Sequence, residues 1–288
     1  MSEASPGKDR ALSRRRRADR AAQVLATAAT VVTVAVLASV VLNVVRSGVE
    51  GSSLSLLTSL PRPVGVPGGG VANAVLGTVL LVMLACAMAL PVGLLAGVHL
   101  AESRSGRIVR IARLAADALA AVPSIVFGMF VFGTVVVKMR HFSALAGSAS
   151  LALVMVPSLA RATEVALRAV PENVREAALA LGATRLRVAL TVVLPSASRG
   201  IGTGVLLAIA RACGETAPLL FTAWNNRFFC DDLRDPSASL PVQIFTYAVS
   251  PYEDWHQKAW ASALVLLAFV LVLHTAARIL SPRREEGA

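Results

Sequence analysis

Two long stretches without a charged residue constrain this chain more than any other feature of its sequence. Neither Val24–Val45 nor Val71–Val98 contains Asp, Glu, Lys or Arg. The hydrocarbon core of a bilayer is about 30 Å thick, so a helix needs roughly 20 apolar residues to cross it. Each stretch is therefore long enough for one crossing. The mean hydropathy of +0.68 and a charged fraction of only 16% exclude an ordinary soluble domain.

Four further apolar stretches bring the number of predicted spans to six. The first stretch is interpreted as a retained helix, because it lacks the small-residue cleavage site and following soluble body that a signal peptide requires. We therefore predict an all-α integral membrane protein with six transmembrane helices. The four further spans run over Ala118–Val137, about His141–Arg168, about Gly200–Ala223 and Ala259–Ala277.

The positions of the basic residues predict the orientation of these spans. Of the 28 Lys and Arg residues, 20 fall in the two terminal tails and in the second-to-third and fourth-to-fifth connections. Seven fall on the opposite side, and Arg211 alone lies inside a predicted span. Because basic residues accumulate on the cytoplasmic side of a membrane, both termini are expected in the cytoplasm. The net charge of +11 thus indicates topology rather than nucleic-acid binding, and Arg14–Arg17 is expected to anchor the first helix against anionic membrane lipid.

Composition divides the chain around these spans. Residues 47–70 are rich in Ser, Gly and Pro and separate the first helix from the other five, which are expected to form the functional core. The histidines are dispersed and the three cysteines are widely scattered, so no metal or cofactor site is predicted. The expected order is a basic cytoplasmic tail (1–20), the first transmembrane helix (21–46), an external linker (47–70), a five-helix core (71–280) with a cytoplasmic loop (171–195) and an external segment (224–258), and a cytoplasmic tail (281–288).

The cytoplasmic loop from Pro171 to Pro195 has the pattern of a docking element. Pro171 can begin a helix at its first position, and the charges of Glu172 and Glu176 favour the amino end of that helix. Gly182 is suited to ending it, so we predict a short helix, a break and a second helix. The small residues after Glu176 give a compact surface that can enter a groove of a partner.

This loop resembles the EAA loop of permease subunits in bacterial ABC importers. In that family the loop is the coupling helix, which sits in a cleft of the ATP-binding subunit. The resemblance implies a type I ABC importer permease fold with a cytoplasmic coupling helix. It rests on Glu176, Ala177 and Ala178, followed at the family's spacing by Gly182, Leu194 and Pro195, with Val192 where the pattern usually has isoleucine.

Four further segments point to one group of these permeases, and they are Ala121–Phe130, Arg161–Glu164, Ala208–Ala223 and Leu240–Ala248. They are similar to the PstA-type permeases of phosphate-specific ABC importers. The resemblance implies a pathway for inorganic phosphate, shared with a PstC-type sister permease and served by a PstB-type ATP-binding dimer and an external PstS-type phosphate-binding protein. This chain has no G-x-x-x-x-G-K-[ST] phosphate loop, so ATP hydrolysis is expected on the partner and the chain is predicted to be a transport subunit, not an enzyme.

Arg211 is the residue most strongly predicted to act in transport. A charged side chain near the centre of a span costs about 2.5–3.5 kcal/mol on insertion scales, so it is expected to face protein or water. Glu215 lies four positions further on and can pair with it. A guanidinium offers a planar fork of donors for phosphate oxygens, and a carboxylate can hold that fork when no anion is present. The competing interpretation is a buried ion pair that only fixes helix packing.

A second charged group lies on one face of the fourth predicted span. Arg161, Glu164 and Arg168 follow the helical spacing i, i+3, i+7. They are either a positively charged flank or the cytoplasmic half of the same anion route, and the family resemblance favours the route for Arg161 and Glu164. For the whole chain, two alternatives to phosphate import stay open. One is an ABC permease for another oxyanion such as sulfate or molybdate, and the other is a non-transporting membrane scaffold.

Overall fold

The structure, a computed structural model, describes residues 6–66, 68–103 and 106–280, with side chains from residue 19 onward. Within these residues every regular element is a helix, as predicted. Five helices are long and apolar enough to cross a membrane, and a sixth crossing is obtained if one bent helix pair is counted as a single span. The predicted carboxyl tail, residues 281–288, lies outside the described residues, as do the side chains of Arg14–Arg17.

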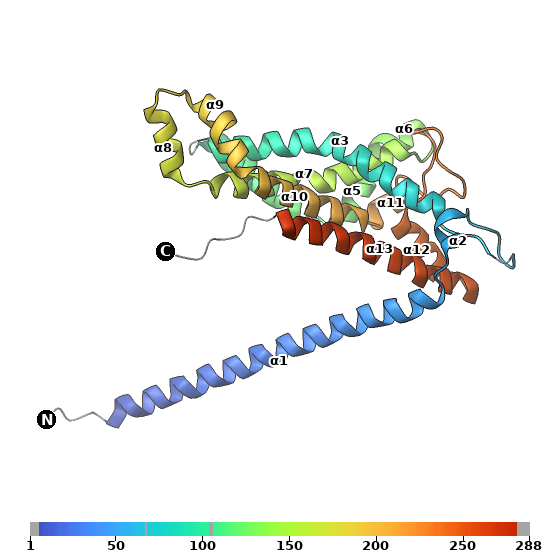
Figure 1. The fold of residues 1–288 in the computed structure, drawn as a ribbon, viewed down its shortest axis with the longest axis horizontal. Helices are drawn as coiled ribbons and strands as arrows, with labels where there is room; N and C mark the ends of the chain where they lie inside the picture. Colours follow the sequence, from blue (N-terminus) through green and yellow to red (C-terminus); the bar gives the residue numbers. More distant parts are fainter. Residues whose placement is uncertain (1–5, 67, 104–105, 281–288) are drawn as a thin grey trace.

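The long helices other than α1 form a bundle with short helices at both ends (Figure 1). Most of the candidate membrane-spanning helices extend beyond the predicted bounds. A short π-helical segment precedes α10. The long helices are α1 (Pro6–Glu50), α3 (Ala72–Glu102), α7 (Ala144–Arg168), α10 (Leu194–Cys213) and α13 (Glu253–Leu280), and the shorter ones are α2 (Leu54–Thr58), α4 (Arg107–Ala121), α5 (Ser124–Val131), α6 (Val137–Met139), α8 (Glu172–Ala180), α9 (Arg185–Val188), α11 (Ala217–Leu220) and α12 (Leu240–Ala248).

Helix α1 stands apart from the bundle over most of its length (Figure 1). No residue of its most apolar stretch is buried. It meets α13 near its carboxyl end, where Gly48 lies against Leu264 and the Trp260 carbonyl. Glycine lets two helices approach closely, so this contact fixes one end of α1 while its apolar surface stays uncovered.

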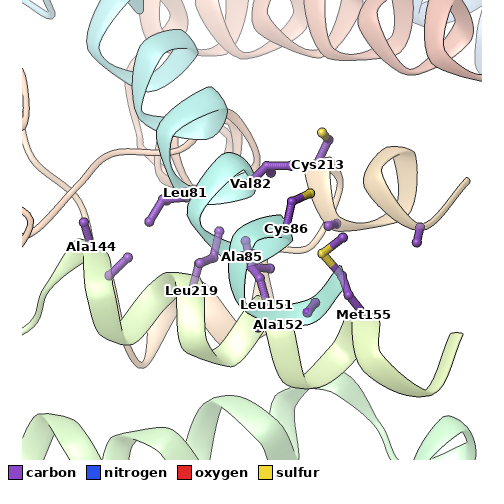
Figure 2. Packing of buried hydrophobic residues seen from close by; sticks show 14 of the residues in the cluster. Leu81, Val82, Ala85, Cys86, Ala144, Leu151, Ala152, Met155, Cys213 and Leu219 are labelled. Carbon is purple, nitrogen blue, oxygen red and sulfur yellow. The ribbon is translucent and has the colours of Figure 1, made fainter. Parts of the chain in front are cut away.

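The core forms where α3 and α7 pack along each other, with the ends of α10 and α11 against them (Figure 2). Leu81 and Cys86 of α3 join Leu151 and Met155 of α7 in one buried cluster, which also contains Cys213 of α10. Small residues set the spacing between these helices. A Cβ at Gly93, for example, would lie 2.6 Å from Cβ of Leu159, so only glycine permits this approach.

The third predicted span, Ala118–Val137, is not one continuous helix. Helix α4 ends at Ala121, and α5 begins at Ser124 in a direction that differs by 97°. Pro123 causes the bend, because proline lacks a backbone N–H and forces the preceding residue, Val122, into an extended conformation. The crossing segment therefore begins at Ser124, and α4 is a separate helix that lies across the direction of the span.

The fifth predicted span, Gly200–Ala223, also ends earlier than expected. The helix runs continuously from Arg185 to Cys213, then breaks at Gly214 before the short helix α11. Cys213 packs in the same cluster as Cys86, which lies near the middle of α3. The carboxyl end of α10 therefore lies at mid-depth in the bundle. Arg211 is in the last turn of a helix rather than in the middle of one.

Candidate functional site

The loop between α7 and α10 folds into the predicted helix, break and second helix. Helix α8 follows Pro171, and Gly182 comes directly after the C-cap residue Leu181, with a φ of +83°, which strongly favours glycine. Thr184 then caps α9, because its hydroxyl accepts a hydrogen bond from the backbone N–H of Arg187. Pro171, Gly182 and Thr184 place α8 at a sharp angle to the helix that begins with α9 and continues into α10, beyond the end of the bundle (Figure 1).

The outer surface of this loop is exposed and partly apolar. Glu176 and Ala177 are exposed, whereas Ala178 is half-buried against the rest of the loop. Leu181 is 88% exposed and Leu186 is 70% exposed, although both side chains are apolar. Exposed leucines at the tip of a protruding element are typical of a surface that another protein covers. Of the residues predicted to contact an ATPase, Leu194 and Pro195 lie in the first turn of α10, at the base of the loop.

Arg175 ties this loop to the bundle. Its side chain is only 13% exposed, and its Nη1 lies 2.5 Å from Oε1 of Glu102 at the end of α3. Its Nη2 donates a hydrogen bond of 2.7 Å to the carbonyl of Leu167 in α7. The sequence analysis missed Arg175, although its position directly before Glu176 was a signal. One side chain thus joins α8 to the ends of two long helices.

Glu164 is the centre of the strongest ionic cluster in the described part of the chain. Its carboxylate is 1% exposed, and Nη1 of Arg161 lies 2.9 Å from Oε2. Arg168 reaches Oε1 at 3.2 Å, and Arg113 reaches the same oxygen at 2.9 Å from Nη2 and 3.0 Å from Nε. A buried carboxylate is stable only when it is paired in this way. Three guanidinium groups around one carboxylate leave two positive charges in excess.

Arg113 is the member of this cluster that the sequence analysis missed. It comes from α4, whereas the other three residues lie on α7. In the sequence, Arg113 is one of several basic residues that flank a predicted span. Arg113 is also 51 positions away from Glu164. Only the 97° bend brings α4 back across the end of α7. The structure thus joins the three predicted residues and adds a fourth.

Arg211 and Glu215 form a looser pair. The Nε of Arg211 lies 3.5 Å from Oε1 of Glu215, and the Arg211 side chain is 54% exposed, against 14% for Glu215. Because α10 ends at Cys213, the two residues no longer lie on one continuous helix, and the pair spans the helix end. The exposed side chain is directed away from the core of this subunit. Within this subunit, the pair is therefore not buried.

The two ionic clusters follow one another along the contact between α7 and α10. Gly204 of α10 packs against Ala162 of α7, next to Arg161. Arg211 lies seven residues beyond Gly204, which is about 10 Å along a helix. No ion pair links the two clusters among the residues with described side chains. They are therefore two separate positions along this contact, one at mid-depth and one toward the end of the bundle that carries α8.

Comparisons with known proteins agree with this architecture. The chain matches the family described as the binding-protein-dependent transport system inner membrane component over residues 89–286. It is 43% identical over 272 residues to the phosphate transport system permease protein PstA of Yersinia pestis, covering 94% of this chain and 92% of the relative. It is 39% identical over 224 residues to the protein of that name from Mycobacterium leprae, covering 76% and 74%.

A solved structure of similar fold supports the same assignment. A chain of the MetNI methionine ABC transporter in an inward-facing conformation superimposes with a TM-score of 0.58, covering 74% of this chain and 95% of that chain at 20% identity. The predicted fold of an ABC importer permease is thereby confirmed. The chain belongs to the family of binding-protein-dependent transport system inner membrane components, within its group of PstA-type permeases.

Proposed function

We propose that this chain is the permease subunit of an ATP-driven phosphate importer and that it forms the pathway for inorganic phosphate together with a sister permease. Its relatives are phosphate transport system permeases. The observation that carries the proposal is the pair of arginine clusters along α7 and α10. Guanidinium groups bind phosphate oxygens through two parallel N–H donors, so each cluster suits this anion.

Arg211 receives the anion at mid-depth. Its contact with Glu215 is 3.5 Å long and open to solvent on the surface of this subunit, so little is lost when the guanidinium changes partner. A phosphate therefore replaces Glu215 instead of meeting an unpaired charge. When the anion leaves, the carboxylate takes its place again, and the guanidinium is never left alone at mid-depth.

The cluster around Glu164 is the second position on the route. Its three guanidinium side chains are between 33% and 54% exposed, so each can present donors to an anion while Glu164 keeps the others in place. The excess positive charge attracts an anion released by Arg211. The route then runs from mid-depth toward the end of the bundle that carries α8.

In this proposal, the loop of α8 and α9 docks on a cytosolic ATPase. Glu176, Ala177, Ala178 and Gly182 form the docking surface, and Leu194 and Pro195 form its base. ATP-driven closure of an ATPase dimer would move α8, and Arg175 would pass that motion to α3 and α7. The two permeases then alternate between outward and inward access.

This assignment fixes the orientation and the partners. The beginning of α1 and the end of α13 lie at the same end of the molecule as α8 (Figure 1), so both termini are cytoplasmic if α8 is. The partners are a PstC-type sister permease, a PstB-type ATPase dimer and an external PstS-type phosphate-binding protein. Membrane lipid surrounds the bundle.

Competition between oxyanions tests the proposal. The complete complex is reconstituted in vesicles, and uptake of labelled phosphate is measured against an excess of sulfate or of molybdate. We expect ATP-dependent phosphate uptake that neither competitor reduces. Strong inhibition by sulfate or molybdate would assign the pathway to that oxyanion, and the absence of any ATP-dependent uptake would favour a scaffold.

A further inference from the structure

A basic cavity of about 240 Å³ lies beside the Glu164 cluster. It is formed where the end of α3, the beginning of α4 and the end of α7 meet. Two of its arginines also contact Glu164, so the cavity adjoins the second position of the proposed route. Its lining consists of Ser103, Gly106, Val109, Arg110, Arg113 and Arg168.

The charge of this cavity is unbalanced. Among the residues that the structure describes, six line the cavity; three of these are arginines and none is acidic. Glu164 balances part of the charge of Arg113 and Arg168, but it also holds Arg161. Among the residues with described side chains, Arg110 forms no ion pair at all. A concave site with an unpaired guanidinium group favours the binding of an anion.

The beginning of α4 adds to this potential. The residue before the helix is Gly106, which has no side chain to accept a hydrogen bond from the first N–H groups. The first turn of a helix carries a partial positive charge and unpaired N–H groups. In α4 these groups lie at the cavity, because Gly106 and Val109 belong to its lining. Backbone and side chains thus favour the same kind of ligand.

The outer face of α4 indicates where the cavity lies in the membrane. Ile108, Ile111 and Leu114 are 75%, 59% and 69% exposed, on the side of the helix away from the buried Val109. A helix with one apolar and one basic face, turned by 97° from the span that follows, is typical of the membrane surface. The cavity therefore lies at the boundary between lipid and water.

We propose that this cavity binds a phosphate-type oxyanion. Resting on the function proposed above, it is the last binding site for inorganic phosphate before release. Arg113 and Arg168 contact Glu164 on one side and line the cavity on the other, so an anion can pass between the two positions without leaving these guanidinium groups. Arg110 belongs to the cavity alone. A lipid headgroup has the same phosphate chemistry and is the other source that the experiment must separate.

Inhibition by internal phosphate tests the cavity. The complete complex is reconstituted so that α8 faces the vesicle lumen, and uptake of labelled phosphate is measured at increasing concentrations of unlabelled phosphate inside. Phosphate held in the cavity blocks the exit. In Arg110→Gln we expect the half-inhibitory concentration to rise about tenfold, the ratio that corresponds to 1.4 kcal/mol of binding free energy. Arg110→Lys keeps the positive charge but loses the planar set of guanidinium donors. Its half-inhibitory concentration should lie between those of the unmodified complex and of Arg110→Gln.

Arg107→Gln is the matched control, because Arg107 is an exposed arginine one turn earlier on α4 and does not line the cavity. Its inhibition curve should equal that of the unmodified complex. Equal curves for Arg110→Gln and the unmodified complex would overturn the proposal. Phosphate uptake by the unmodified complex, measured without internal phosphate, tests the proposed transport function itself. If this uptake is missing, the transport function is contradicted, independently of the cavity.

Two vesicle compositions separate the sources of phosphate. One contains phosphatidylcholine alone, and the other also contains anionic phosphatidylglycerol. We expect the effect of Arg110→Gln to be the same in both. If the effect appears only with phosphatidylglycerol and Arg107→Gln reproduces it, the cavity binds a lipid headgroup and the assignment to transported phosphate is wrong.

Discussion

The two arginine clusters of this permease differ in how tightly their carboxylates are held. Glu164 is buried and contacts three guanidinium groups at 2.9–3.2 Å, which link α4 to α7. Glu215 contacts only Arg211, at 3.5 Å, and Arg211 is more than half exposed. A carboxylate that joins two helices contributes to stability, whereas a single long contact leaves its arginine available. The difference indicates that Glu164 organises its cluster and that Arg211 exchanges partners.

The largest expected effect is on stability, in Glu164→Gln. This substitution keeps the shape of the side chain but leaves three guanidinium groups without a negative charge. We expect the free energy of unfolding to fall by about 1.5–3 kcal/mol, the range for hydrogen bonds to charged groups, and the thermal midpoint of the purified complex to fall with it. The matched control is Glu215→Gln, for which we expect at most about 1 kcal/mol. Equal shifts would contradict the distinction between the two clusters.

The pair of Arg175 and Glu102 extends this comparison to the coupling loop, since it is also mostly buried. Arg175→Glu places two carboxylates against each other, so we expect ATP hydrolysis by the complex to lose its dependence on transport. The charge-swapped double variant, Glu102→Arg with Arg175→Glu, restores an ion pair and should recover part of the coupling. Transport-stimulated ATP hydrolysis measures both. If the double variant shows no more transport-stimulated ATP hydrolysis than Arg175→Glu alone, this ion pair does not take part in coupling.

A smaller effect is expected in transport by Glu215→Gln. Without the Glu215 carboxylate, Arg211 has no ion-pair partner before the anion binds. We therefore expect slower phosphate uptake, with assembly of the complex unchanged. An exposed pair of this kind contributes up to about 1 kcal/mol, so the change in rate should stay within about fivefold. Initial rates of labelled phosphate uptake measure it. Complete loss of uptake would mean that Glu215 is as important as Arg211 itself.

The smallest expected effect is on the rate at which Cys230 is chemically labelled. This labelling shows which end of the bundle faces outward. Cys230 belongs to the segment between α11 and α12, and this segment lies at the end of the bundle opposite α8 (Figure 1). Partial burial raises the pKa of its thiol, and the carboxylates of Asp231, Asp232 and Asp235 raise that pKa further, so less thiolate is present near neutral pH.

A membrane-impermeant maleimide added outside should therefore label Cys230 slowly, and faster as the pH rises. The other two cysteines, Cys86 and Cys213, are buried and serve as internal controls. Labelling of Cys230 only from the cytoplasmic side would reverse the orientation and, with it, the direction of the proposed route.

Features that depend on local sequence were predictable. Charge-free stretches identified most spans, and the spacing around Glu176 and Gly182 predicted the protruding loop. Arg161, Glu164 and Arg211 stood out because charged residues are rare in apolar stretches. Helical periodicity also predicted the pairing of Arg161 with Glu164 on α7. The same spacing predicted Glu215 as the partner of Arg211, although α10 ends between the two residues.

Features that depend on the direction of the chain after a break were not predictable. Pro123 lies inside the predicted span Ala118–Val137, and nothing in the sequence shows that the chain turns by 97° there. Arg113 meets Glu164 only because of that angle. For the same reason the basic cavity has no sequence signature, since its arginines come from two helices far apart in the chain.

The central claim is that Arg211 is held loosely because the transported anion takes over its contacts. Uptake of labelled phosphate by the reconstituted complex with Arg211→Met tests it most directly, with Arg199→Met as control, since Arg199 is an exposed arginine on the same helix that forms no ion pair among the residues with described side chains. We expect Arg211→Met to abolish uptake while the complex stays assembled, and Arg199→Met to transport normally. Normal uptake by Arg211→Met would contradict the account.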